Sequence, residues 1–287
     1  TWLMQQRRQG MTTPVTIVSG ASANEVQSVL KALGDGAQDC MDKSELQGDI
    51  EPVVQRFTAL IEGSVNRRAL NQKKSDKTKP KSFLAKPPFP DLILLGASTG
   101  GTETLCTMLK NMPPSTPPVL VVQHIQPGFS KGFAERLAMA SGLTLGEPRD
   151  GVTLKPRHLY MAHEDYHIGV KQRGTELILS VSGVGPVNRH RPSVDFLFNS
   201  AQQVKANIFA VLLTGMGVDG ARGLLSLKQM GATTLVQDEA SCVVFGMPKE
   251  AISLGAAGFV GDPHDIRREI DRVLLDQEYL AKRRKVA

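Results

Sequence analysis

Three polar residues of this sequence carry the side chains that acyl transfer needs. Ser98 lies in Gly96-Ala97-Ser98-Thr99-Gly100, the Gly-x-Ser-x-Gly pattern of a nucleophile elbow, in which a sharp turn exposes the serine near main-chain N–H groups. His124 follows an apolar run, and Asp219 closes a glycine-rich stretch. A hydroxyl, an imidazole and a carboxylate are together the parts of a Ser-His-Asp triad.

Each of these residues also has an interpretation without catalysis. The turn at 96–101 fits a phosphate-binding loop or a plain helix-capping turn, although Ser98 stands where the dinucleotide-binding pattern has its second glycine. A histidine such as His124 is commonly a surface or capping residue, and Asp219 fits an N-cap aspartate. Three such residues together, each after a predicted strand, favour catalysis.

The elements that must position these residues alternate between strand and helix from residue 91 onward. The sequence predicts strands at Leu92–Leu95, Pro118–Gln123, His158–Ala162, Glu176–Val181, Ile208–Leu213, Thr233–Gln237 and Gly258–Val260. It predicts helices at Thr102–Asn111, Gly132–Ser141, Ser193–Val204, Ala221–Met230, Pro248–Leu254 and Asp265–Asp276.

Near-continuous apolar strands such as Val119–Val122 are typical of a parallel sheet that is buried on both faces. We therefore predict an α/β fold, a doubly wound, mostly parallel sheet with helices on both faces. Between Gly142 and Gly185 the pattern changes to short strands separated by turn residues, which predicts antiparallel hairpins added to that sheet.

In a doubly wound sheet the ligand site lies at the carboxyl ends of the strands, so Ser98, His124 and Asp219 are expected to meet there. Asp219 is expected to begin a helix whose N-terminus keeps the carboxylate ionised and able to orient an imidazole. The chain order Ser-His-Asp differs from the Ser-Asp-His order of the α/β-hydrolases, which disfavours a lipase-like enzyme.

Charge is concentrated outside the predicted core. The chain has 287 residues, a net charge of +6 and 41% apolar residues, which is enough for one large or two ordinary domains. Eight Lys and Arg against Asp76 alone lie within residues 66–90, and four more basic residues lie at 282–285, so the remainder is mildly acidic. We interpret 66–90 as a Pro/Lys-rich linker and 281–287 as a basic tail, and expect no nucleic-acid partner.

Cysteine usage and hydropathy predict a protein of the reducing cytoplasm. Cys40, Cys106 and Cys242 form no Cys-x-x-Cys pair, so we expect neither a disulfide framework nor a metal site. No apolar run approaches the roughly 18 residues of a membrane span, so no membrane insertion is expected.

Residues 1–65 form a short piece of their own. They predict a strand at Val15–Val18, a helix at Asn24–Leu33, a brief segment at Asp39–Met41 and a helix from Ile50 to about Glu62. These elements are too few for a closed α/β domain and would leave strand edges unpaired.

The long piece, residues 91–280, resembles the catalytic domain of the chemotaxis protein-glutamate methylesterases, the CheB family. The matching stretches are Gly96–Gly101, Gln123–His124, Asn188–Asp195, Leu213–Gly220 and Gln237–Ala251. The resemblance implies that Ser98 is the nucleophile, His124 the general base and acid, and Asp219 the orienting carboxylate, with Thr99 and Met216 near the oxyanion site.

The same resemblance implies the activity and the partners. It implies hydrolysis of glutamate 5-O-methyl esters on methyl-accepting chemotaxis receptors with release of methanol, and deamidation of receptor glutamines, without any cofactor. It also implies a chemotaxis histidine kinase as a partner. In this context the run Arg189-His190-Arg191 either recognises acidic receptor surface or is simply a solvated loop.

Residues 1–65 resemble the second half of a response-regulator receiver domain, with Ser19 in the place of the switch hydroxyl and Lys43 in that of the phosphate-contacting lysine. The phospho-acceptor of that family lies upstream, so the chain is expected to be a fragment or a truncated form. Half a receiver is expected neither to accept phosphate nor to cover the esterase site fully, which predicts constitutive, phosphate-insensitive activity.

Two other functions remain open from the residues alone. One is a nucleotide-binding α/β protein in which Gly96–Gly101 holds phosphate without catalysis. The other is a receptor-docking module with an inactive esterase site.

Overall fold

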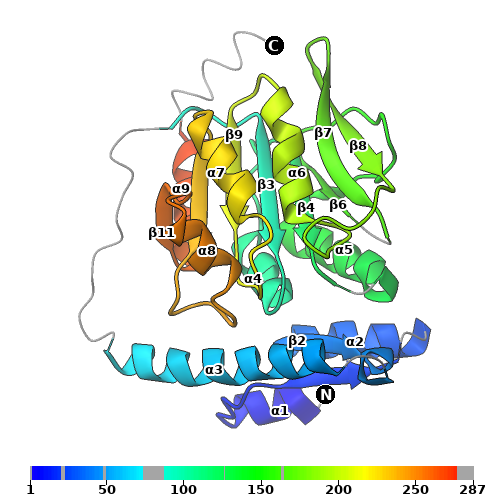
Figure 1. Cartoon of the computed structure of the whole chain (residues 1–287), viewed down its shortest axis with the longest axis vertical. Coiled ribbons are helices and arrows are strands. Elements are labelled where there is room, and N and C mark those ends of the chain that lie inside the picture. Colours follow the sequence, from blue (N-terminus) through cyan, green and yellow to red (C-terminus); the bar gives the residue numbers. More distant parts are fainter. Residues whose placement is uncertain are drawn as a thin grey trace.

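The centre of the molecule is a seven-stranded sheet in which every neighbouring pair is parallel (Figure 1). The structure, a computed structural model, describes residues 2–20, 23–47, 50–73, 87–125, 127–162 and 165–276. The strands lie in the order β11 (Phe259–Gly261), β10 (Thr233–Gln237), β9 (Ile208–Leu212), β3 (Leu92–Ala97), β4 (Val119–Gln123), β6 (His158–Met161) and β5 (Thr144–Leu145).

The order of the strands reverses at β3. This strand pairs with β4 on one side and with β9 on the other, placing Ala97 beside Gln123 and Gly96 beside Leu212. Chain segments that leave the carboxyl ends of these strands therefore diverge around a crevice, which is where doubly wound sheets bind ligands. Ser98, His124 and Asp219 follow β3, β4 and β9 respectively, so the topology brings all three to one edge of the sheet.

Alternate residues of the central strands enter two separate apolar layers. Ile93 and Leu95 of β3 pack with one layer, and Leu92 and Leu94 with the other, all four fully buried. Burial on both faces explains the near-continuous apolar runs of the sequence.

Helices cover both faces of the sheet. The first layer contains α4 (Gly101–Met108), α5 (Pro127–Ser141) and α9 (Pro263–Leu274). The second contains α6 (Val194–Ser200), α7 (Ala221–Gln229) and α8 (Met247–Ser253). The predicted doubly wound fold is confirmed, with β10 at its predicted residues and the helices within a few residues of theirs except α5, which begins at Pro127.

The hairpin prediction needs correction in one respect. Strands β7 (His167–Arg173) and β8 (Glu176–Ser182) are antiparallel as expected, but they form a sheet of their own instead of extending the central one. Ile168 and Leu179 pack in the same apolar layer as α6, so the hairpin is held by side-chain packing on that helix. The short strand β5 was not predicted, because two residues give no periodic pattern.

The N-terminal residues fold against the part of the chain that forms the seven-stranded sheet. They contain α1 (Trp2–Arg8), β1 (Thr16–Ser19), α2 (Ala23–Gly34), β2 (Asp39–Asp42), the 3₁₀ helix η1 (Lys43–Gln47) and α3 (Glu51–Lys73). Strands β1 and β2 make a two-stranded parallel sheet. Val29, Leu30 and Leu33 of α2 belong to the same apolar cluster as Phe129 and Phe133 of α5, so a shared core offsets the small size of this unit.

Helix α3 is longer than predicted. It runs eleven residues beyond Glu62 to Lys73, so the first part of the expected linker, 66–73, is helical. Residues 74–86 of that linker and the basic tail 281–287 lie outside the described residues. Within the parts of the chain that are described, no helix is long and apolar enough to cross a membrane.

The shared core predicts that α2 unfolds together with the catalytic part of the chain. Leu33 is fully buried, so Leu33→Ala should destabilise the protein by about 2–5 kcal/mol. Circular dichroism during heating should show one transition at a lower Tm. Lys31→Ala, an exposed change on the same helix, is the control. Two separate transitions, with only the smaller one shifted, would contradict a common core.

Candidate active site

Main-chain hydrogen bonds continue past the ends of the three central strands and fix the candidate residues. The Ser98 N–H donates to the Thr214 carbonyl at 3.0 Å, and the His124 N–H donates to the Ala97 carbonyl at 3.0 Å. The polypeptide segments that carry Ser98, His124 and Asp219 are thus tied to one another at the carboxyl edge of the sheet, as the sequence predicted.

The turn that carries Ser98 is tightly enclosed. Gly100 has a φ of +79°, and a Cβ there would lie 2.3 Å from Val243, so both the turn and the close contact require glycine. The buried Gln123 side chain donates to the carbonyls of Ser98 and His124, at 2.8 and 2.9 Å. Ser98 itself is only 8% exposed, so its hydroxyl lies in a largely desolvated site.

His124 is held by one ring nitrogen and has the other free. Its Nε2 lies 2.9 Å from Oδ2 of Asp219, and the two side chains are 9% and 1% exposed. An ionised carboxylate only accepts hydrogen bonds, so Nε2 carries the proton and Nδ1 of the neutral ring is the basic nitrogen. Nδ1 is buried and has no partner among the described residues.

No hydrogen bond joins Ser98 to His124 within the described part of the chain. Catalytic hydrogen bonds of this kind are commonly long in the absence of substrate and tighten in the complex. The Asp219–His124 half of the predicted triad is therefore assembled, and Ser98 lies beside it at the same sheet edge.

The carboxylate of Asp219 is the most highly connected group of the site. It accepts from the Ser193 hydroxyl (2.8 Å), the Val194 N–H (2.7 Å) and the Asp195 N–H (3.2 Å), besides His124. Burial alone would raise the pKa of this carboxyl, but the bonds from His124, Asn188 and the Val194 N–H outweigh burial and hold the pKa well below its usual range.

This arrangement corrects one expectation. The N-terminus of α7, which Asp219 precedes, was expected to keep the carboxylate ionised. The helix that does so is α6, because the N–H groups of Val194 and Asp195 belong to its first turn and Ser193 is its N-cap.

The second helix receives the reciprocal contact. Asp195 of α6 accepts from the Gly223 N–H of α7 at 2.7 Å, so the first turn of α7 has a carboxylate from α6, and the first turn of α6 has Asp219 from the loop that precedes α7. Asn188 joins the two, since its Nδ2 donates to Asp195 at 2.6 Å and to Asp219 at 2.7 Å. Burial raises the pKa of Asp195, in contrast to Asp219.

A strained turn presents Asn188 and His190 to the site. Val187 and His190 exchange two main-chain hydrogen bonds, of 3.0 and 2.9 Å, around Asn188 and Arg189, whose φ values are +52° and +68°. Left-handed φ values are uncommon in residues other than glycine and mark a constrained turn. The ring of His190 lies on that of His124, with centroids 3.8 Å apart and planes 10° apart.

The expectation that Arg189-His190-Arg191 faces a receptor is therefore only partly compatible with the structure. His190 is turned inward onto His124, and Arg191 forms an ion pair with Asp165. Only Arg189 is fully exposed.

His167 is a further supporting residue that the sequence did not reveal. It is fully buried in β7, and its Nδ1 accepts from the Ser193 N–H at 3.1 Å. Its Nε2 lies 3.2 Å from the Gly185 carbonyl, which assigns the proton to Nε2. Burial lowers the pKa of His167, in keeping with a neutral ring that braces the N-cap of α6.

The N-terminal unit reaches the rim of this site. Leu60 of α3 packs with Val243 and Val244, and Met216 lies against the same cluster. The helix approaches so closely that a Cβ at Gly63 would lie 1.9 Å from the Val243 carbonyl oxygen. The sequence led us to expect that half a receiver would leave the site partly uncovered. In the structure α3 lies against the rim of the site. Helices α2 and α3 lie across one end of the molecule (Figure 1).

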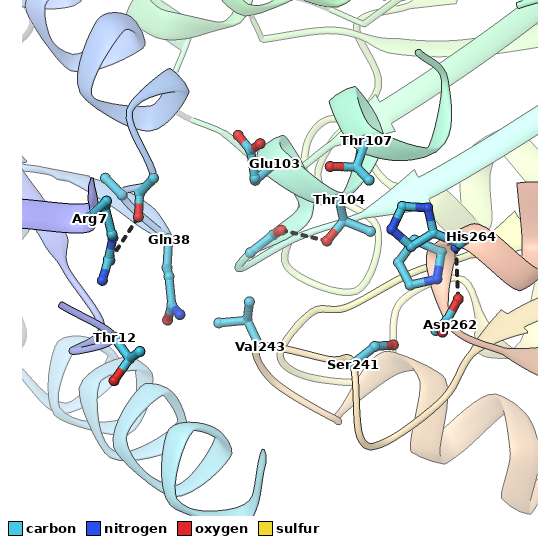
Figure 2. A pocket seen from close by; sticks show the side chains of 14 residues that line it. Arg7, Thr12, Gln38, Glu103, Thr104, Thr107, Ser241, Val243, Asp262 and His264 are labelled. Atoms are coloured by element: carbon cyan, nitrogen blue, oxygen red, sulfur yellow. Dashed lines mark hydrogen bonds between the residues drawn. The ribbon is translucent and has the colours of Figure 1, made fainter. Parts of the chain in front are cut away.

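A cavity of about 430 Å³ separates the two units beside this contact (Figure 2). Arg7 and Gln38 line it from the N-terminal side, and Glu103 and His264 from the catalytic side. Ser98, His124 and Asp219 are not among its lining residues, so this cavity is not the substrate site.

Ser19 and Lys43, the two residues predicted to remain from a receiver domain, lie in the small N-terminal sheet and directly after it. Ser19 ends β1 opposite Asp42, the last residue of β2, and the exposed Lys43 follows. The structure thus places Ser19 and Lys43 at the same end of the small sheet, and their roles remain predictions. In the described ranges, no group of three His, Cys, Asp or Glu residues could hold a metal ion.

The fold and the side chains at its edge define the class of a candidate serine hydrolase on a doubly wound α/β sheet. The family model for CheB methylesterase matches residues 93–270, which is more than half of the chain. The chain belongs to the CheB methylesterase family.

Relatives of known name share most of the chain. The protein-glutamate methylesterase/protein-glutamine glutaminase of Pectobacterium atrosepticum is 40% identical over 263 residues, covering 90% of this chain and 75% of that protein. The protein-glutamate methylesterase/protein-glutamine glutaminase 2 of Pseudomonas aeruginosa is 41% identical over 252 residues, covering 85% and 71%. The crystal structure of the Thermotoga maritima CheB methylesterase catalytic domain superposes with a TM-score of 0.60 at 37% identity, covering 65% of this chain and 98% of that one.

The environment of Asp219 predicts how stability depends on pH. A carboxyl whose pKa is lowered on folding stabilises the protein above its unfolded pKa, near 4, and that contribution is lost as pH falls further. The free-energy difference between the wild type and Asp219→Asn, measured by urea unfolding, should therefore shrink below pH 4. It should shrink by about 1.4 kcal/mol for every unit by which folding lowers the pKa.

Asp150→Asn is the control for this measurement, because Asp150 is an exposed aspartate that accepts one main-chain hydrogen bond. A gap between wild type and Asp219→Asn that stays constant from pH 7 to pH 3 would mean that Asp219 is not a stabilised carboxylate.

Proposed function

We propose that this chain hydrolyses glutamate 5-O-methyl esters on chemoreceptors, with Ser98 as nucleophile, His124 as general base and acid, and Asp219 as the carboxylate that orients His124. The observation that carries the proposal is the bond between Nε2 of His124 and Asp219, which leaves Nδ1 unpartnered at the edge where Ser98 lies. The names of the relatives and the family to which the chain belongs support the substrate class.

The first half of the reaction forms an acyl-enzyme. Nδ1 of His124 takes the proton of the Ser98 hydroxyl as the oxygen attacks the ester carbonyl. The imidazolium that forms is stabilised by the ionised Asp219. It then gives its proton to the departing methanol, leaving the glutamyl group on Ser98.

The second half repeats these steps with water. His124 takes a proton from water, the hydroxide attacks the acyl carbonyl, and Ser98 leaves with the proton that His124 returns. The free glutamate of the receptor is the product. Deamidation of a receptor glutamine follows the same path with ammonia as the first leaving group, so one site serves both activities.

The negative charge of each tetrahedral intermediate needs main-chain donors. The N–H groups of Thr99 and Met216 have no hydrogen-bond acceptor among the described residues. Thr99 directly follows the nucleophile, the usual place of one oxyanion donor, and Met216 lies in the loop that continues from β9 toward Asp219. We assign both N–H groups to the oxyanion site.

The N-terminal residues 1–65 are the second half of a receiver, joined by residues 66–90 to a catalytic domain at 91–280. Ser19 and Lys43 keep the positions of the switch hydroxyl and the phosphate-contacting lysine. This unit covers the rim of the site through the contact of Leu60 with Val243 and Val244.

Replacement of the nucleophile is the first test of the proposed function. Ser98→Ala should abolish methanol release from methylated receptor, a loss of at least a thousandfold, because no acyl-enzyme can form. Ser226→Ala, which removes a half-buried serine of α7 whose hydroxyl donates to the Arg222 carbonyl, should retain the wild-type rate. Undiminished methanol release by Ser98→Ala would refute the triad.

Covalent labelling separates the proposal from its rivals. A fluorophosphonate should label Ser98 in the wild type and leave Ser98→Ala unlabelled. A nucleotide-binding protein would leave Ser98 unlabelled, and a docking module with an inactive site would bind receptor without releasing methanol.

The contact of α3 with the rim predicts a second change in activity. Leu60 is 4% exposed, so Leu60→Asp places a charge in the contact and should loosen the cover. Loss of one or two kcal/mol of contact changes an equilibrium about five- to thirtyfold, and methanol release should rise within that range.

The neighbouring Ile61→Asp is the matched control, since Ile61 is 63% exposed on the same helix. Equal rates for both variants would remove the role of α3 as a cover.

A further inference from the structure

Two histidines from distant parts of the chain lie face to face in the site. The ring centroids of His124 and His190 are 3.8 Å apart, and the ring planes differ by 10°, so the rings are in contact over their whole faces. His124 follows β4, and His190 ends the strained turn that begins at Val187. The triad as described above makes no use of His190.

The stack supplies a restraint that the triad lacks. The bond from Nε2 to Asp219 fixes one point of the His124 ring, but the ring can still tilt about that point, since the torsion between Cβ and the ring is broad in histidine. No other hydrogen bond of the ring is present among the described residues, because Nδ1 is unpartnered. A flat ring in parallel contact removes the tilt and fixes the direction in which Nδ1 points.

His190 is uncharged at neutral pH, which is compatible with its close contact with His124. Burial and the nearby His124 lower the pKa of His190 to about 4, so its ring is neutral at neutral pH. The ionisable groups around the pair are Asp219 from the loop after β9 and, through Asn188, Asp195 from α6. Arg191 is turned to Asp165.

A neutral ring can face His124 in both of its protonation states. When His124 takes the Ser98 proton it becomes a cation above the π face of His190, an attractive arrangement, whereas two imidazolium rings at 3.8 Å would repel. The turn that supplies His190 holds Asn188 and Arg189 at positive φ, a conformation that costs free energy and persists only where surrounding contacts enforce it.

We propose that His190 is a positioning residue of the esterase reaction, holding the ring of His124 in the plane in which Nδ1 meets the Ser98 hydroxyl. The inference rests on the proposed function of the triad. It assigns to His190 no contact with substrate and no proton transfer.

The test compares His190→Phe with His190→Leu. Both side chains are apolar and of similar size to histidine, but only phenylalanine keeps a flat ring. An aromatic pair contributes about 0.5–1.5 kcal/mol, so His190→Leu should lower kcat for methanol release about two- to thirteenfold with KM unchanged. His190→Phe should stay close to wild type. His264→Leu, at an exposed position of α9, is the control.

A second measurement on the same variants does not depend on activity. NMR relaxation of the Cδ2–H group of His124 should show a rigid ring in wild type and His190→Phe and a more mobile ring in His190→Leu. Equal ring mobility in all three proteins would overturn the inference, as would equal kcat for His190→Phe and His190→Leu or a change confined to KM.

These two measurements distinguish a failure of the proposed function from a failure of the role of His190. A wild type that releases no methanol refutes the proposed function, while the NMR comparison still decides whether His190 restrains His124. An active wild type with no difference between the Phe and Leu variants refutes the role of His190 alone.

Discussion

The structure depends on one buried charge, the carboxylate of Asp219. A carboxylate that is 1% exposed is strongly disfavoured unless donors surround it, and here two main-chain N–H groups of α6, the Ser193 hydroxyl, Asn188 and His124 do so. These donors come from three separate segments of the chain. Satisfying one charge therefore fixes the N-terminus of α6, the turn at Asn188 and the ring of His124 at the same time.

The parallel sheet brings the segment that carries this charge to the same edge as Ser98 and His124. Because β4 and β9 flank β3, the segments that follow them converge on the Ser98 turn, and main-chain bonds from Ser98 and His124 extend the ladder beyond the strands. Asp195 of α6 accepts from the first turn of α7, and Asp219 from the loop before α7 accepts from the first turn of α6. The candidate site thus lies at the ends of the central strands and helices, and the N-terminal unit meets it at the rim through α3.

The sequence predicted the parts of this arrangement that depend on local pattern. Apolar runs located the ends of β3, β4 and β9, and with them the sheet edge to which Ser98, His124 and Asp219 belong. The catalytic roles of these three residues stay predictions. The sequence did not predict the contacts that join distant turns: the donors to Asp219 come from α6 instead of α7, His167 braces Ser193, and His190 lies on His124. These contacts depend on the three-dimensional path of the segment 183–193, which has no periodic pattern.

The observed fold differs from the sequence prediction in two further places. Strand β7 was not among the predicted strands, because its residues do not alternate: the first four are buried and the last three exposed. Packing of the hairpin on α6 accounts for its position apart from the central sheet. Helix α3 continues to Lys73 because Arg67, Arg68, Ala69 and Leu70 are strong helix formers. The many basic residues of 66–90 had suggested a linker from residue 66 onward.

The central claim is that an ionised Asp219 fixes the tautomer of His124. The ¹⁵N chemical shifts of the two ring nitrogens of His124, in protein labelled at histidine and assigned by comparison with His124→Gln, test it directly at neutral pH. We expect a protonated Nε2 and an unprotonated Nδ1. A protonated Nδ1, or equal exchange of the proton between the two nitrogens, would contradict it.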